Sequence, residues 1–383
     1  MSEQAEQPIK TFTYSRTDLI NQIEPWQNGV KLSIFDYLLH ETWDNKMRQP
    51  NNGPFLYPLD SIIKLMPPGN IKYQGVFCPS RVHAKRPPSK QASSTEKKDD
   101  SENQPKVLVP FNSESFHFGK IPKNELLFKV QHVKIGVTSD IFINNAPYER
   151  CHSLLITELE NQKPQIIFYE GLVAALEVCL LSTHPGMRLL YNSMGACASV
   201  NQMHFQIYYT STYQLPIDHC EVIGKVENEK AVGLNSSAHV FKAGTGLDQS
   251  IPCYIIKGIN STNLTTIATQ IQTFTDFLVA ENIPHNLAIS RDHKIGELKV
   301  FIWARKFQQN RSYTEFNVAC TELIGHLYYG KRELFDNHTE TEIAEEFAKM
   351  KLDDKVQEKV EKQLGEIFDP QGRGIFSAIF GWF

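Results

Sequence analysis

Segments rich in apolar residues recur along the chain, and their lengths distinguish strands from helices. Residues 165–183 form the longest segment, interrupted only by Glu170 and Glu177, and this predicts a helix packed on a sheet. Shorter segments of strand-like length and content are 125–133, 139–144, 152–156, 187–192 and 199–209. Antiparallel strands with one helix among them indicate an α+β layer and not a doubly wound parallel sheet.

A second series of elements follows a polar break at residues 228–237. It comprises a strand at 253–257, a helix at 265–281, strands at 286–290 and 298–304, and one or two amphipathic helices within 340–364. This order loosely repeats the first series, so we expect two related halves. The predicted division is a loosely ordered N-terminus over residues 1–30, a catalytic domain over 31–230 and a C-terminal α+β domain over 238–383.

Two segments do not fit this regular pattern. Residues 87–106 contain no large apolar side chain, so the sequence predicts a disordered insertion there. Residues 374–383 are strongly apolar for a chain terminus. Docking of this tail on the protein's own surface is favoured over contact with a partner or a membrane surface.

Composition and charge limit the classes of function. A formal net charge of −4 and the lack of a basic stripe argue against nucleic-acid binding. The polar N-terminus is unlike a signal peptide, and no apolar run reaches the ~20 residues of a membrane-spanning helix. Seven scattered cysteines without a CxxC pair indicate free thiols, with neither disulfides nor a zinc site. These features predict a cytoplasmic protein without a transmembrane segment.

The segment 191–209 carries the clearest chemical signal. If its end is a strand, Gln202, His204 and Gln206 share one face, and the intervening apolar residues face the core. The imidazole then lies between two carboxamides, each of which is both a donor and an acceptor. A histidine in this setting stays neutral and can attack phosphorus, because no carboxylate raises its pKa.

Other short polar side chains nearby extend this pattern. Asn192, Ser193 and Ser199 are candidate donors to phosphate oxygens. On its own, however, a Gln-x-His-x-Gln strand is more often a satisfied polar face than a catalytic site. The lack of a second His or Cys at ligand spacing argues against a metal site.

A small-residue loop followed by His204 and Gln206 resembles the nucleotidyltransferase branch of the histidine-triad superfamily. That branch has the pattern His-x-His-x-Gln, and its middle histidine becomes nucleotidylated. The resemblance implies a histidine-triad-like sheet, with His204 as the nucleophile and with Gln206 and Ser199 as phosphate ligands. The first histidine of the pattern is Gln202 here, and glutamine in this supporting position either replaces its hydrogen bonding or lowers activity.

More of the chain resembles the GDP-hexose phosphorylases. The motifs that carry the likeness are residues 43–47 (WDNKM), 85–87 (KRP), 109–112 (VPFN), 116–118 (FHF), 125–128 (ELLF), 152–156 (HSLLI), 191–195 (YNSMG), 283–286 (IPHN) and 322–326 (ELIGH).

The resemblance implies that GDP-D-glucose and inorganic phosphate give GDP and D-glucose 1-phosphate through a guanylyl-histidine, without a cofactor. The partners are then a nucleotide sugar and phosphate. Three alternatives remain: GDP-L-galactose as substrate, hydrolysis that releases GMP, or a nucleotide-sugar-binding protein without turnover.

A basic cluster before the insertion is a further candidate. Lys85 and Arg86, with Arg81 nearby, have the charge to hold a sugar phosphate or the incoming phosphate. The alternative is a solvated basic turn. Glu322 and His326 have the i, i+4 spacing of a helix-face pair, and we assign them no role.

Overall fold

The computed structural model describes residues 9–20, 23, 31–65, 69–84, 105–210, 213–220, 222–225, 239–243, 250–292, 295–308 and 314–368. The predicted insertion at 87–106 lies outside these ranges except for residues 105 and 106, and the apolar tail at 374–383 lies wholly outside them.

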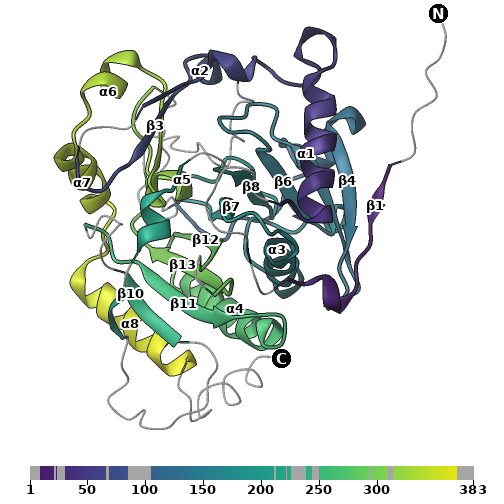
Figure 1. The fold of residues 1–383 in the computed structure, drawn as a ribbon. Coiled ribbons are helices and arrows are strands. Elements are labelled where there is room, and N and C mark those ends of the chain that lie inside the picture. The colour runs from purple at the N-terminus through teal and green to yellow at the C-terminus, as the bar shows by residue number, and fades with distance from the viewer. Residues whose placement is uncertain are drawn as a thin grey trace, which may run out of the picture.

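Eleven strands of the described chain form one continuous sheet (Figure 1). Its order is β1-β4-β5-β6-β8-β7-β12-β13-β11-β10-β9. Neighbouring strands are antiparallel, except that β1 and β4 are parallel. The strands are β1 (Thr11–Phe12), β4 (Leu126–Gln131), β5 (Thr138–Ile143), β6 (Ser153–Thr157), β7 (Met187–Asn192), β8 (Phe205–Tyr209), β9 (Val222–Lys225), β10 (His239–Ala243), β11 (Tyr254–Ile259), β12 (His285–Arg291) and β13 (Leu298–Ala304).

The sheet contains the same strand order twice. Inward from the edge strand β1 the first half reads β4-β5-β6-β8-β7, and inward from the other edge the second half reads β9-β10-β11-β13-β12. In chain order, each half has a helix between its third and fourth strands. This helix is α3 (Tyr169–Leu181), between β6 and β7, in the first half and α4 (Leu264–Ala280), between β11 and β12, in the second. The halves join where β7 pairs with β12. The α+β fold with two related halves that the sequence predicts is therefore present.

Helices cover one face of this sheet. α1 (Ile34–Met47), α3, α4 and α8 (Asp354–Ile367) pack on it and share a core with the sheet side chains that point toward them. Leu189 of β7 and Ile289 of β12 belong to this core, whereas their neighbours Leu190 and Ala288 belong to a second core on the opposite face. The central strands are apolar at nearly every position because both of their faces are buried.

A small second sheet and short helices cover the opposite face. The sheet has the order β14-β3-β2, and β14 pairs with β3 in parallel. These elements are β2 (Ile63–Leu65), β3 (Gln74–Phe77), α2 (Ser80–Ala84), α5 (Cys320–Leu323), β14 (His326–Tyr329), α6 (Arg332–Asn337) and α7 (Glu340–Ala348). Segments from the beginning and the end of the chain thus lie side by side here.

The N-terminus is more ordered than the sequence predicts. Thr11 and Phe12 pair with β4, and Leu19 is buried in the helix-side core. The prediction of a loosely ordered N-terminus therefore does not hold for residues 9–20. Their contacts are with distant elements, which local sequence pattern does not reveal.

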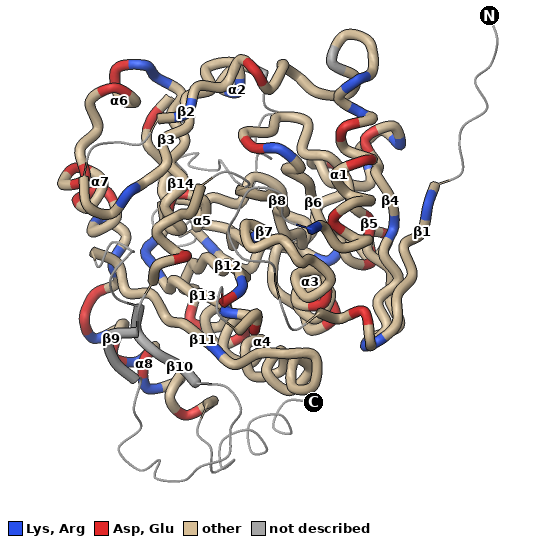
Figure 2. Tube along the Cα trace, viewed as in Figure 1, with Lys and Arg blue, Asp and Glu red and all other residues tan. Residues whose placement is uncertain are grey.

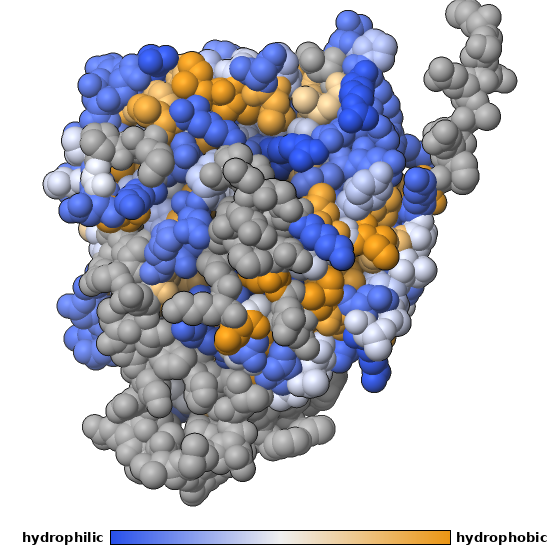
Figure 3. Space-filling model, in the orientation of Figure 1, coloured by the Kyte–Doolittle hydropathy of each residue, from blue (hydrophilic) through white to orange (hydrophobic). Residues whose placement is uncertain are grey.

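The surface of the described chain carries both signs of charge. Figure 2 shows Lys and Arg interspersed with Asp and Glu along the tube. Apolar side chains reach the surface in the region of α2 and β3 (Figure 3), and Ile63 and Leu65 of the neighbouring β2 are among the exposed large apolar residues.

The seven cysteines, all described, form no disulfide. Of the helices that the structure describes, none has the length and apolar content to cross a membrane.

Candidate active site

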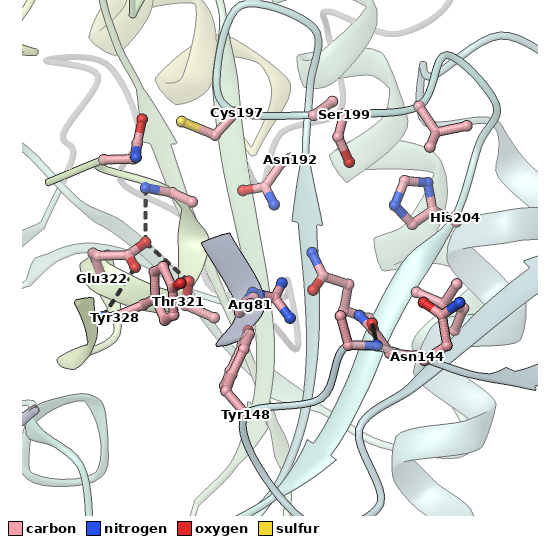
Figure 4. A pocket seen from close by; sticks show the side chains of 18 of the residues that line it. Arg81, Asn144, Tyr148, Asn192, Cys197, Ser199, His204, Thr321, Glu322 and Tyr328 are labelled. Carbon is pink, nitrogen blue, oxygen red and sulfur yellow. Dashed lines mark hydrogen bonds between the residues drawn. The ribbon is translucent and has the colours of Figure 1, made fainter. Parts of the chain in front are cut away.

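A cavity lies beside the end of β7, where residues from both halves of the chain meet (Figure 4). The first half supplies Asn192 at the end of β7, His204 just before β8 and Gln206 within β8. Arg81 comes from α2, and Glu322 comes from α5. A catalytic domain that ended at residue 230 would therefore lack part of this wall.

The turn after β7 is bonded tightly to the second half. Ser193 N donates to His285 O over 3.0 Å, and His285 N donates to the Ser193 hydroxyl over 2.8 Å. Gly195 has a φ of +76°, and a Cβ there would lie 2.3 Å from the ring of Phe307, so glycine alone fits. Ser193 is fully buried behind the cavity wall and does not take the substrate-facing place that the sequence predicts.

The ring of His204 is oriented by two oxygen acceptors. Its Nδ1 lies 2.8 Å from the backbone carbonyl of Gln202 and 3.0 Å from Oε1 of Gln165. Neither acceptor has a proton to give, so the neutral ring carries its proton on Nδ1 and donates it to them. Nε2 then carries a lone pair, as a nucleophile requires. Phe118 packs edge-on against the ring, with centroids 4.8 Å apart.

Gln165 is a second residue that positions His204, and the sequence does not predict it. Its side chain is buried, its Oε1 also accepts from His204 N over 3.1 Å, and its Nε2 donates to Asn192 O over 2.9 Å. The residue lies ahead of α3, far from His204 in sequence, within a segment that reads only as apolar helix. No local pattern marks it.

Gln202, His204 and Gln206 do not share a strand face, because β8 begins at Phe205. The Gln202 side chain turns away from the cavity: its Oε1 accepts from Phe118 N over 2.7 Å, and its Nε2 donates to Leu159 O over 3.1 Å. Gln202 is not among the residues that line the cavity. Its link to His204 runs through the backbone carbonyl, which any residue at this position provides.

Three predicted phosphate ligands do line the cavity: Gln206, Ser199 and Asn192. The Gln206 Oε1 lies 3.1 Å from Nε2 of the buried His152, which holds the carboxamide in place. The Asn192 Oδ1 accepts from Asn286 Nδ2 over 2.6 Å and from Cys320 N over 2.8 Å. These bonds turn the Asn192 amide nitrogen toward the cavity (Figure 4), where it can donate to a ligand oxygen.

The charged residues of the wall come from outside segment 191–209. Arg81 stacks on Tyr148, and Glu322 accepts from Ala319 N and from the Thr321 hydroxyl, each over 2.9 Å. Burial raises the pKa of Glu322 above its usual value. Helix α5 ends at Leu323, and His326 is the first residue of β14. Glu322 and His326 therefore do not lie on one face of a helix.

Lys85 and Arg86 lie outside the described residues, and their proposed contact with phosphate stays a prediction. Within the described residues no group of three or more His, Cys, Asp or Glu side chains is placed to hold a metal ion.

Comparison with protein families gives two matches that follow one another along the chain. The model of the GDPGP1-like N-terminal domain matches residues 34–208, and that of the GDPGP1-like C-terminal domain matches residues 252–371. The chain belongs to the GDPGP1-like family. The first match contains strands β4 to β7 and all but the last residue of β8 in the first half, and the second contains β11, β12 and β13 of the second half, whereas β9 and β10 lie between the two matches.

Relatives within and near the GDPGP1-like family are phosphorylases of nucleotide sugars by name. GDP-D-glucose phosphorylase 1 of Danio rerio is 28% identical over 87% of this chain and 91% of its own length. The Homo sapiens protein of the same name is 28% identical over 87% of this chain and 86% of its own. GDP-L-galactose phosphorylase 2 of Arabidopsis thaliana is 25% identical over 89% and 77%, respectively.

Solved structures show that the fold is shared more widely. Yeast Ap4A phosphorylase Apa2 in complex with Ap4A superposes with a TM-score of 0.53 and covers 84% of this chain and 99% of its own. The sequence identity is 14%, so the likeness concerns the fold alone. The α+β architecture with a mostly antiparallel sheet that the sequence predicts is thus shared with this phosphorylase.

Proposed function

We propose that this GDPGP1-like protein is a GDP-D-glucose phosphorylase that forms GDP and D-glucose 1-phosphate through a guanylyl-His204 intermediate. One observation carries the proposal. Two oxygen acceptors hold His204 Nδ1, at the wall of a cavity that also presents Gln206, Ser199 and Asn192. The names and coverage of the relatives support the choice of substrate class.

In the first step, the lone pair of His204 Nε2 attacks the α-phosphorus of GDP-D-glucose. The bond from that phosphorus to the bridging oxygen breaks, and D-glucose 1-phosphate leaves with the electron pair. In the second step, an oxygen of inorganic phosphate attacks the same phosphorus, the P–Nε2 bond breaks and GDP leaves. Two in-line displacements retain configuration at phosphorus.

Neutral donors around His204 suit the change of charge in these steps. Gln206, the Ser199 hydroxyl and the Asn192 amide can donate to the non-bridging phosphate oxygens as negative charge builds on them. The sugar phosphate is already a good leaving group, so positioning and electrostatics supply most of the catalysis. Each preorganised donor contributes about 10²-fold to 10³-fold in kcat in comparable oxyanion sites.

Glutamine at the position of the family's first histidine is compatible with turnover. The contact from residue 202 to His204 is made by the backbone carbonyl, and the Gln202 side chain is bonded to Phe118 N and Leu159 O. A change of side chain at this position therefore leaves the orienting bond of the nucleophile in place. This argues against a nucleotide-sugar-binding protein without turnover.

The test is to incubate the full chain with GDP-D-glucose, with and without phosphate, and to separate the nucleotides. We expect GDP only when phosphate is present and no product from His204→Asn, which keeps a donor near the Nδ1 position but lacks a nucleophilic nitrogen. GMP as the only product would indicate a hydrolase. Faster turnover of GDP-L-galactose would change the sugar and keep the mechanism. Binding without turnover by the wild type would contradict the proposal.

A further inference from the structure

Arg81 is a buried cation that the steps above do not use. It lies in α2, directly after β3, and its side chain is 6% exposed. The guanidinium lies over the ring of Tyr148, with 4.8 Å from its carbon to the ring centroid, and at 5.6 Å over the ring of Tyr328. Figure 4 shows it between Tyr148 and Asn192, directed into the cavity. The two ring contacts restrict the position of the guanidinium at the cavity wall.

One end of this guanidinium is unsatisfied within the described chain. The Arg81 Nη1 is buried, and no described residue forms a hydrogen bond with it. A buried charge without a hydrogen-bonding partner is costly, so such a group is retained where a ligand supplies the partner. A planar guanidinium matches two oxygens of a phosphate group.

The hydrogen bonds of the two charged residues in the wall leave the positive charge open to an anion. Among the described residues that line the cavity, Arg81 alone carries a permanent positive charge and Glu322 alone carries a carboxylate. Glu322 uses its oxygens on the Thr321 hydroxyl and on the backbone nitrogens of Ala319 and Tyr328, and no ion pair joins it to Arg81. The Arg81 charge is therefore available to a substrate phosphate.

The order of the two displacements indicates which substrate phosphate Arg81 contacts. In-line attack places the leaving group of the first step opposite His204, and the acceptor of the second step must enter from that same side. The phosphate of the departing sugar 1-phosphate and the incoming inorganic phosphate therefore occupy one subsite in turn. Water can enter the same subsite, and its attack on the guanylyl phosphorus would release GMP, with the P–Nε2 bond broken and a proton lost to solvent.

We propose that Arg81 binds inorganic phosphate in this acceptor subsite and so makes the second step phosphorolysis instead of hydrolysis. The inference rests on the proposed function. Arg81 is then a specificity-determining residue. Its positive charge favours occupancy of the subsite by the phosphate dianion and disfavours occupancy by water.

The test measures the ratio of GDP to GMP and the KM for phosphate in Arg81→Gln and Arg81→Lys. We expect Arg81→Gln to raise the KM for phosphate at least tenfold and to release GMP as a substantial share of product. Arg81→Lys keeps the positive charge but loses the planar group that can donate to two phosphate oxygens at once. We expect its KM for phosphate and its share of GMP to lie between those of Arg81→Gln and the wild type. Lys120→Gln, which removes an exposed cation that does not line the cavity, is the matched control and should keep the wild-type ratio.

Each outcome decides between roles. An unchanged ratio and an unchanged KM for phosphate in Arg81→Gln would overturn the inference, and so would a parallel fall of both products at constant ratio, which indicates a role in holding the donor or the fold. If Arg81→Gln gives no product, the ratio of GDP to GMP in Arg81→Lys decides between the two roles. Failure of the wild type to make GDP would instead contradict the proposed function, so the two failures are distinguishable.

Discussion

At the scale of single residues, the protonation of His204 depends on which atoms face its Nδ1. Both acceptors are neutral: the Gln202 carbonyl at 2.8 Å and Gln165 Oε1 at 3.0 Å. A carboxylate in either place would also favour the Nδ1–H tautomer, but it would stabilise the imidazolium, which cannot attack phosphorus. The family resemblance of the sequence predicts His204 as the nucleophile, whereas Gln165 is close to it only in the folded chain.

Gln165→Glu tests this view of the nucleophile. An anion beside Nδ1 raises the pKa of His204, so at a given acidic pH a smaller fraction of the ring is neutral. Activity is then lost at a higher pH on the acid side, and we expect the acid limb of the kcat/KM profile to move up by about 1 unit or more.

Gln165→Ala is the companion variant. It removes the acceptor without adding charge, so kcat should fall while the acid limb stays where the wild type has it. Identical acid limbs in all three proteins would show that residue 165 does not act on the ring of His204.

At the scale of elements, the local sequence pattern predicts the strands of the sheet well, but it is wrong for residues 199–204, which precede β8. The bounds predicted for residues 187–192 and 298–304 are those of β7 and β13, because strands buried on both faces are apolar runs with polar ends. The strand predicted at 199–209 begins only at Phe205. Ahead of it, Met203 N donates to Lys163 O, and His204 N donates to the Gln165 side chain.

Those two bonds explain the error. Alternation of polar and apolar residues predicts a strand, but the backbone donors of Met203 and His204 are satisfied by the loop before α3 and not by a neighbouring strand. A pattern of period two cannot distinguish these cases, because the competing partner lies some 40 residues away in sequence (residues 163–165 against 203–204).

Gln202 is expected to stabilise the loops around the nucleophile. Its carboxamide joins Phe118, which lines the cavity, to Leu159, and these two residues belong to separate 3₁₀ segments. Gln202→Leu would leave a buried backbone donor unpaired and should cost about 1–3 kcal/mol in the free energy of unfolding. Chemical denaturation measures this loss. A Leu variant as stable as the wild type would contradict the role.

At the scale of the whole molecule, the two halves meet at the site. The Asn192 side chain accepts from Asn286 of β12 and from the backbone of Cys320, so one residue of the first half is held by two segments of the second. The order of the predicted elements, together with the family resemblance, suggests two related halves. It could not show that the cavity lies across both, because that depends on how β7 pairs with β12.

Buried neutral histidines make the whole molecule sensitive to acid. Burial lowers the pKa of His285, His40 and His184 to about 4 and that of His326 to about 3. In the unfolded chain these groups bind a proton below about pH 6.5, whereas in the folded chain they do not. The free energy of unfolding should therefore fall as the pH drops from about 6.5 to about 4.

His285→Gln isolates one contribution to that slope. At about 1.4 kcal/mol per pKa unit, a shift from 6.5 to about 4 corresponds to at most about 3 to 4 kcal/mol over this window. The variant should have a shallower dependence of unfolding free energy on pH than the wild type, whatever its stability at pH 7. Equal slopes in the two proteins would show that His285 does not contribute.

The guanylyl-histidine intermediate is the central claim, and it can be measured directly. The full chain is mixed with GDP-D-glucose without phosphate, kept at neutral to alkaline pH, and analysed as intact protein and as peptides by mass spectrometry. We expect one guanylyl group on the peptide that contains His204, its conversion to GDP when phosphate is added, and no adduct in His204→Asn. Phosphate-dependent formation of GDP by the wild type without any adduct, or an adduct that persists in His204→Asn, would contradict the account.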